Sequence, residues 1–74
     1  MKIEELKENI LVKNIKHGTV EHVLHLGIMK IDDKWIDSVT YSGKCRHTNR
    51  RRVFTKRLED FLKEFEIYEK KIFD

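Results

Sequence analysis

The residues with the most evident chemistry form a run of positive charge between residues 44 and 57. This basic block contains seven lysines or arginines and no aspartate or glutamate, with Arg50, Arg51 and Arg52 consecutive near its centre. Guanidinium groups pair with phosphates through parallel hydrogen bonds and stack on flat bases. The basic block therefore favours contact with a nucleic acid.

Aromatic and hydrogen-bonding side chains adjoin the basic block. Tyr41 precedes the block, and Phe54, His47 and Asn49 lie within it. A basic segment beside aromatic residues is typical of proteins that hold RNA or single-stranded nucleic acid. The predicted nucleic-acid-binding residues are Lys44, Arg46, His47, Arg50, Arg51, Arg52, Lys56, Arg57 and Tyr41.

Two other interpretations of the basic block stay open. Its charge could be offset by the acidic segment that follows, at Glu59, Glu64 and Glu66. Alternatively, the basic surface or the acidic segment could bind a protein, as in a small phage-type inhibitor or adaptor that acts on a host protein. Salt discriminates between the partners, because phosphate binding weakens steeply with salt whereas a protein interface depends on a few anchor residues.

The histidines and the single cysteine match no established catalytic or metal-binding pattern. His22 and His25 are three residues apart, which in a regular strand places them on opposite faces. Cys45 and His47 lack the second ligand pair that zinc sites usually have. There is no nucleophile elbow, phosphate loop or dinucleotide fingerprint. We therefore expect no enzymatic activity, no metal and no cofactor, with a small nuclease built from histidines as the enzymatic alternative.

Length and composition predict one small domain over residues 1–74. Charged residues and hydrophobic residues each make up 39% of the chain, and the formal net charge is +3. A domain of this length buries only about 60% of its unfolded surface, so its core is small. One cysteine allows no internal disulfide, and the N-terminus lacks the apolar run of a signal peptide. These features predict a cytoplasmic protein without a membrane partner.

The segment 57–72 is predicted to form an amphipathic helix. Its apolar residues recur at steps of three and four: Leu58, Phe61, Leu62, Phe65, Tyr68 and Ile72. That spacing forms one apolar stripe on a helix. Thr55 is the predicted N-cap of this helix. Because the stripe runs past what a small sheet can cover, a homodimer through the C-terminal helix is a further hypothesis.

The middle of the chain is predicted to form antiparallel strands. Residues 19–31 and 35–41 are rich in β-branched and apolar residues, and a turn at 32–34 separates them. A basic loop over 44–52 then leads into a third strand at 52–56. A short helix or turn followed by a strand at about 10–15 is predicted for the N-terminus.

Glycines and side-chain alternation refine this prediction. Gly18 permits a turn after the first strand, and Gly27 is the expected place for a bulge or bend. Trp35, Val39 and Tyr41 share one strand face and form the predicted core. If Phe54 also faces the core, Arg52 and Lys56 point the same way, whereas Arg51, Val53 and Thr55 point outward.

The resulting fold class is α+β: a small antiparallel sheet of three to five strands, able to curl into a barrel, with a C-terminal amphipathic helix. The order of residues resembles small bacterial and phage domains that have no assigned activity. The matching residues are Gly18, Val23, Leu24, Val39, Tyr41, Val53, Phe54, Arg57 and Phe61. The resemblance covers about residues 18 to 65 and departs at the basic insertion before Val53. It implies a small β-rich fold in a bacterial or phage setting and supplies no activity.

Overall fold

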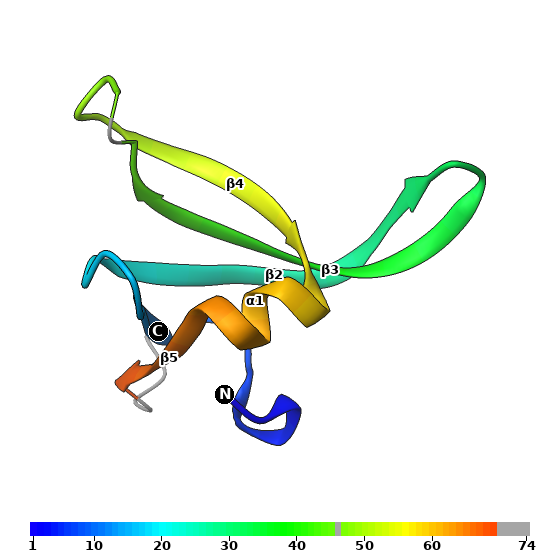
Figure 1. Ribbon diagram of the computed structural model, residues 1–74, viewed down its shortest axis with the longest axis horizontal. Helices are drawn as coiled ribbons and strands as arrows, with labels where there is room; N and C mark the ends of the chain where they lie inside the picture. Colours follow the sequence, from blue (N-terminus) through cyan, green and yellow to red (C-terminus); the bar gives the residue numbers. More distant parts are fainter. Residues whose placement is uncertain (46, 70–74) are drawn as a thin grey trace.

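The computed structural model describes residues 1–45 and 47–69 of the chain (Figure 1). Its elements are a 3-10 helix η1 (Ile3–Glu5), strands β1 (Leu11–Asn14), β2 (Val20–Ile31), β3 (Lys34–Lys44) and β4 (Arg51–Arg57), helix α1 (Leu58–Glu64) and strand β5 (Phe65–Glu69). The predicted short N-terminal helix and first strand are confirmed by η1 and β1. No helix in these ranges is long and apolar enough to cross a membrane.

The five strands form one antiparallel sheet in the order β4-β3-β2-β1-β5. This arrangement confirms the predicted α+β class. The sheet is open, because β4 and β5 are its two edges and do not pair with each other in the described part of the chain. Closure into a barrel is therefore not found. Helix α1 leads from the end of β4 to the start of β5 and packs between them (Figure 1).

The prediction of one helix over 57–72 is wrong beyond Glu64. Helix α1 has seven residues, and the chain then becomes extended and pairs with β1, with Asn14 opposite Phe65 and Val12 opposite Ile67. Hydrogen bonding to the free edge of β1 outweighs continuation of the helix, because helix propensity is a weak preference that tertiary contacts override. Residues 70–72 of the predicted helix lie outside the described residues.

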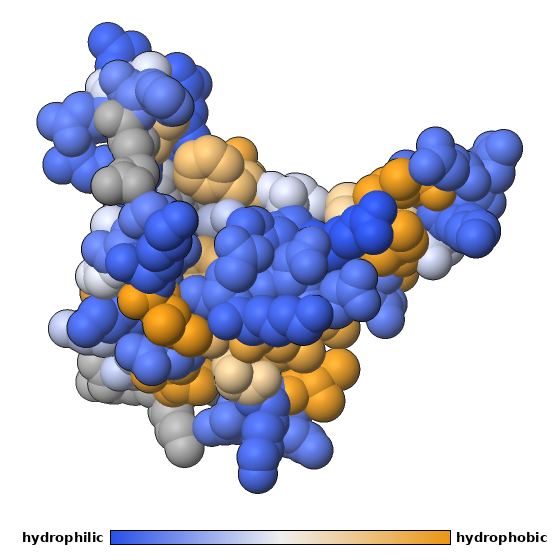
Figure 2. Space-filling view, viewed as in Figure 1, coloured by the Kyte–Doolittle hydropathy of each residue, from blue (hydrophilic) through white to orange (hydrophobic). Residues whose placement is uncertain are grey.

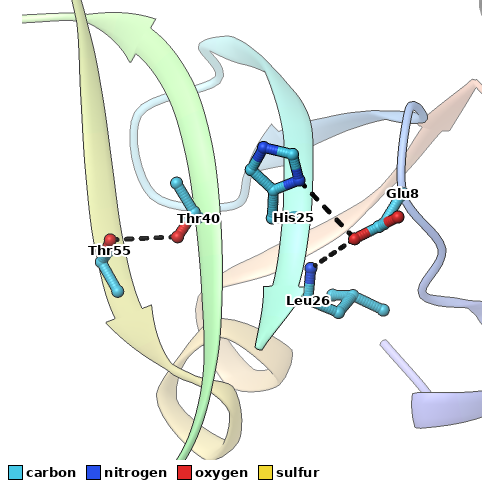
Figure 3. Close-up of polar contacts among 5 residues, drawn as sticks. All are labelled: Glu8, His25, Leu26, Thr40 and Thr55. Atoms are coloured by element: carbon cyan, nitrogen blue, oxygen red, sulfur yellow. Dashed lines mark hydrogen bonds and ion pairs between the residues drawn. The ribbon is translucent and has the colours of Figure 1, made fainter. Parts of the chain in front are cut away.

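The start of the helix also differs from the prediction. Arg57, in an extended conformation, is the N-cap of α1, and no side chain caps that end. Thr55 instead lies within β4, where its hydroxyl hydrogen-bonds to the hydroxyl of Thr40 on β3 at 3.1 Å (Figure 3). The strand continues past Thr55 because it pairs with β3 as far as Arg57.

The buried core lies between the sheet and α1. It consists of Leu6, Ile10, Val12, Val23, Val39, Tyr41, Phe61 and Phe65. Phe61 from α1 stacks on Phe65 from β5 with ring centroids 4.3 Å apart, and Tyr41 lies 5.3 Å from each ring. The predicted core positions Val39 and Tyr41 are thus confirmed.

Trp35, the third predicted core residue, is 66% exposed. It lies near the turn of the long β2–β3 hairpin, which projects away from α1 and the core (Figure 1). Side-chain alternation gives the correct face within β3, but no other element covers the sheet at this distance from the core. The exposure of Trp35 is therefore a consequence of hairpin length.

Two turns agree with the sequence. Gly18 has φ of 71°, and Asp32 and Asp33 have φ of 49° and 63°. Positive φ at both central residues is the geometry of tight hairpin turns, whose twist matches the flanking strands. The turn predicted at 32–34 is therefore confirmed, as is the turn allowed by Gly18.

The bulge in β2 lies before the predicted position at Gly27. Pairing with β3 is regular around Gly27 but shifts between Val23 and His25. As a result His22 is opposite Ser42 and His25 is opposite Thr40, so both histidines occupy the same face. The expectation of opposite faces is wrong, because the extra residue of a bulge interrupts the two-residue alternation.

The N-terminal segment is tied to β2 next to this bulge. The Glu8 carboxylate accepts a hydrogen bond from the Leu26 backbone N–H at 3.0 Å and lies 3.8 Å from Nδ1 of His25 (Figure 3). The β1–β2 ladder ends at His22, so the Glu8 side chain supplies the partner that a strand would give further along the ladder.

Candidate nucleic-acid interface

The basic block lies on the β3–β4 hairpin. The two strands pair without interruption from Ser38 opposite Arg57 to Lys44 opposite Arg51. The connecting loop covers residues 45–50, which is shorter than the predicted loop over 44–52 because both strands extend further. Within the loop, the Cys45 N–H donates to the Arg50 carbonyl at 2.7 Å. The loop cations are thus attached to a hydrogen-bonded hairpin.

The strand geometry divides the basic block between two faces, as predicted from alternation. Phe54 is opposite the buried Tyr41 and packs against the core. Arg52 and Lys56, two residues away on either side, are on the same face as Phe54, whereas Arg51 is on the other face. Three consecutive arginines therefore cannot contact one flat surface together.

Four cations at the end of the hairpin have no ion pair within the described part of the chain. They are Lys44, Arg50, Arg51 and Arg52, which together we name the basic hairpin end. All four are exposed, and Arg51 Nη2 donates a hydrogen bond to Ser42 Oγ at 3.2 Å. Figure 2 shows hydrophilic side chains covering this projecting hairpin. The basic hairpin end thus presents positive charge that no carboxylate of the described residues meets at ion-pair distance.

The two cations at the opposite end of β4 are paired with the acidic helix. Lys56 Nζ lies 2.9 Å from Glu64 Oε1, and Arg57 Nη1 lies 4.0 Å from Glu59 Oε1. Offset of the block by the acidic helix therefore holds for Lys56 and Arg57. It does not extend to the basic hairpin end.

The remaining predicted site residues are placed differently from one another. His47 is exposed in the loop, whereas Tyr41 is only 6% exposed and packs in the aromatic core. Burial, together with the negative charges of Glu21 and Glu64, raises the pKa of Tyr41 to about 12. Most of the Tyr41 ring is therefore covered and does not form a surface platform for a base. Arg46 lies outside the described residues.

The thiol of Cys45, at the start of the loop, has a shifted pKa. Hydrogen bonds from the backbone and the hydroxyl of Thr48, and from the backbone of His47, lower the pKa of the Cys45 thiol. A lower pKa increases the thiolate fraction, which is the reactive form. Among residues 1–45 and 47–69, no three His, Cys, Asp or Glu side chains gather as a metal site requires.

Sequence reasoning missed Glu21 and Gly43, which lie at the base of the basic hairpin end. Glu21 is only 8% exposed, and a Cβ atom at Gly43 would lie 2.6 Å from its Oε1. Burial raises the pKa of Glu21, while the charges of Lys56 and Arg51 lower it by less. Side-chain alternation could have indicated the burial of Glu21. This residue is two positions before the core residue Val23 and so lies on the same face of β2.

Comparison with family models, curated proteins and solved structures finds no match to this chain. The resemblance to small bacterial and phage domains is therefore an expectation from the residue pattern. The function has to be inferred from the geometry of the chain itself.

Proposed function

We propose that this protein binds RNA or single-stranded nucleic acid through the basic hairpin end. The observation that supports this function is the group of four exposed cations, Lys44 and Arg50 to Arg52, without ion-pair partners in the described ranges. Exposed cations can meet phosphates without first breaking an internal ion pair. They also gain from release of the counterions that surround a nucleic acid.

Single strands suit this surface better than a duplex. The arginines lie on both faces of a narrow hairpin and on its loop, so their charges follow a curved path. A flexible strand can wrap around such a path, whereas a stiff duplex meets only one side. Val53, which is 64% exposed between the cations of β4, adds apolar surface against which a base can pack.

The proposal is tested by binding of a labelled mixed-sequence RNA over a series of salt concentrations. Four phosphate contacts on a single strand predict a slope of about −3 in a plot of log K against log salt concentration. A variant with Arg50, Arg51 and Arg52 all changed to Glu is expected to lose binding at low salt.

The control carries the same change of net charge elsewhere. It changes Lys7, Lys16 and Lys34 to Glu; all three are exposed and lie outside the paired part of β3 and β4, which begins at Ser38 and ends at Arg57. This variant is expected to bind RNA within a few-fold of wild type, because phosphate contact depends on local charge. Equal losses in both variants would mean that net charge alone attracts RNA. Absence of wild-type binding at low salt would refute the proposal.

A protein-binding function is the second candidate. The observation that favours it is the exposure of large apolar side chains at the other projecting hairpin, with Ile28 61% and Trp35 66% exposed. Exposed apolar residues grouped together are typical of interaction surfaces. A phage-type inhibitor or adaptor of a host protein would bind without strong dependence on salt, and substitution of Trp35 would weaken it.

A further inference from the structure

A cavity of about 260 Å³ opens at the base of the basic hairpin end. Its lining residues are Glu21, Tyr41, Lys44, Cys45, His47 and Phe54. It thus combines two aromatic rings, a buried carboxylate and the loop side chains of the candidate nucleic-acid interface. Ligand sites commonly have this composition, an apolar wall with a few convergent polar groups.

The carboxylate of Glu21 is the unusual feature of this cavity. Its Oε2 atom is buried and forms no hydrogen bond to any described residue. A buried polar atom without a partner is unfavourable by about 1–3 kcal/mol, and more when the group is charged. Such an atom is stabilised by protonation, by an ordered water or by a donor from a bound molecule.

Gly43 gives the carboxylate its position. A Cβ atom at residue 43 would lie 2.6 Å from Oε1, 2.8 Å from Cγ and 2.9 Å from Cδ of Glu21. Any other residue at this position would therefore displace the Glu21 side chain. The absence of a side chain at Gly43 keeps the carboxylate directly over β3, beside the rings of Tyr41 and Phe54.

The surroundings discriminate between two kinds of ligand. A carboxylate with aromatic neighbours could bind a cation, but Lys44 lines the cavity and the charges of Lys56 and Arg51 reach Glu21. These positive groups repel a cationic ligand. They favour a ligand with an anionic backbone and a flat, uncharged group that donates hydrogen bonds. A nucleotide has both parts.

We propose that this cavity binds one guanine base of a single strand whose phosphates lie along the basic hairpin end. This inference rests on the proposed nucleic-acid-binding function. Guanine presents N1–H and the 2-amino group side by side on its Watson–Crick edge, and a carboxylate can accept both. Uracil offers one N–H between two carbonyl oxygens, which the carboxylate repels. Because Oε2 is buried, this contact requires the Glu21 side chain to rotate toward the opening of the cavity.

The test compares three RNA octamers that differ at one central position: all-uridine, one guanosine, and one inosine. Inosine keeps N1–H but lacks the 2-amino group. We expect the guanosine octamer to bind wild type roughly tenfold more tightly than the all-uridine octamer, with inosine between them. A second readout is the rate of alkylation of Cys45, which also lines the cavity. At equal RNA occupancy, the guanosine octamer should slow this reaction more than the all-uridine octamer does.

Two variants test the residues. Glu21→Gln, which replaces one acceptor oxygen with a donor, should bring the guanosine-to-uridine affinity ratio close to one. Gly43→Ala should do the same by displacing the carboxylate. Glu4→Gln, which changes an exposed glutamate on η1, is the matched control and should keep the wild-type ratio. Thermal unfolding of each variant establishes that it is folded.

The outcomes separate this inference from the proposed function. Equal affinity for all three octamers in wild type, with salt-dependent binding intact, would overturn the guanine inference and leave the proposed function standing. A guanosine preference that survives in folded Glu21→Gln would also overturn it. If no octamer binds at low salt, both proposals fail together.

Discussion

The β2–β3 and β3–β4 hairpins share strand β3 and project from the same core, yet the exposed side chains along them differ in chemistry. The β3–β4 hairpin terminates in the unpaired cations of the basic hairpin end. The β2–β3 hairpin carries exposed Leu26, Ile28 and Trp35, which we name the apolar hairpin end, and the turn beyond them is hydrophilic (Figure 2). The described residues show neither group packed into the core. We propose that the two ends contact different kinds of molecule, and the predictions below test this comparison.

The largest expected effect separates the shared core from the apolar hairpin end. Tyr41→Ala and Trp35→Ala each remove an aromatic ring from β3, but Tyr41 is 6% and Trp35 66% exposed. Loss of the buried ring should lower the free energy of unfolding by about 3–5 kcal/mol. Loss of the exposed ring should change it by roughly 0.5 kcal/mol or less. Chemical denaturation measures both, and a comparable loss in Trp35→Ala would show that the apolar hairpin end is packed in solution.

The second prediction compares the two ends directly in RNA binding. Changing Arg50, Arg51 and Arg52 to Ser removes three phosphate contacts, which should weaken binding on the order of a hundredfold at low salt and flatten the salt slope by about 2. Changing Ile28 and Trp35 to Ser should alter RNA affinity by less than about twofold, because neither carries charge. Fluorescence anisotropy measures both. A large loss in the second variant would mean that RNA also contacts the apolar hairpin end.

The third prediction concerns pH and the buried carboxylate beneath the basic hairpin end. Burial raises the pKa of Glu21 above its ordinary value of 4.5, so the folded state holds its proton over a pH range in which the unfolded state has lost it. The stabilisation that protonation of Glu21 gives the folded state is complete below the ordinary pKa of the carboxyl. It decreases as the pH rises through the raised pKa of the folded state. Glu21→Gln lacks this decrease.

The measurement is the free energy of unfolding of wild type and Glu21→Gln from about pH 4 to about pH 8. The two proteins share every ionisable group except Glu21, so the contributions of the shared groups cancel in the difference. The variant should gain stability relative to wild type as pH rises. A difference that does not change with pH would show that the Glu21 pKa is the same in the folded and unfolded states.

The smallest effect sharpens the contrast between the base and the end of the β3–β4 hairpin. The Lys56–Glu64 pair at the base is partly exposed, so a double-mutant cycle with alanine should give a coupling of about 0.2–1 kcal/mol that decreases with salt. The same cycle between Arg51 and Glu64, which form no ion pair within the described ranges, should give a coupling near zero. Equal couplings would remove the distinction between paired and unpaired cations.

Local patterns accounted for most of the fold. The β-rich middle, the turns at Gly18 and at 32–34, the strand after the basic loop and the start of a helix after β4 all follow from neighbouring residues. The helix prediction failed after Glu64 because its apolar spacing fits both outcomes. Phe65 is 1% exposed in the strand, and the same ring would have been buried on a helix.

The candidate site was predicted only in part, for a related reason. The sequence located the basic block and the alternation of Arg52, Phe54 and Lys56 in β4. It also offered Glu64 as a partner for the block, but it did not specify that Lys56 would pair with Glu64 while Arg52 has no ion pair in the described structure. Ion pairing depends on distances between elements, which the order of residues along one strand does not specify.

The sequence by itself determined the local features: charge placement, turn chemistry and the two-residue period of each strand. Tertiary structure alone decided which edge β5 covers, where the bulge in β2 reverses the alternation, and that Gly43 leaves room for the Glu21 carboxylate. The physical reason is the range of the forces involved. Turn and strand preferences act between neighbours, whereas sheet pairing and burial depend on residues brought together from distant parts of the chain.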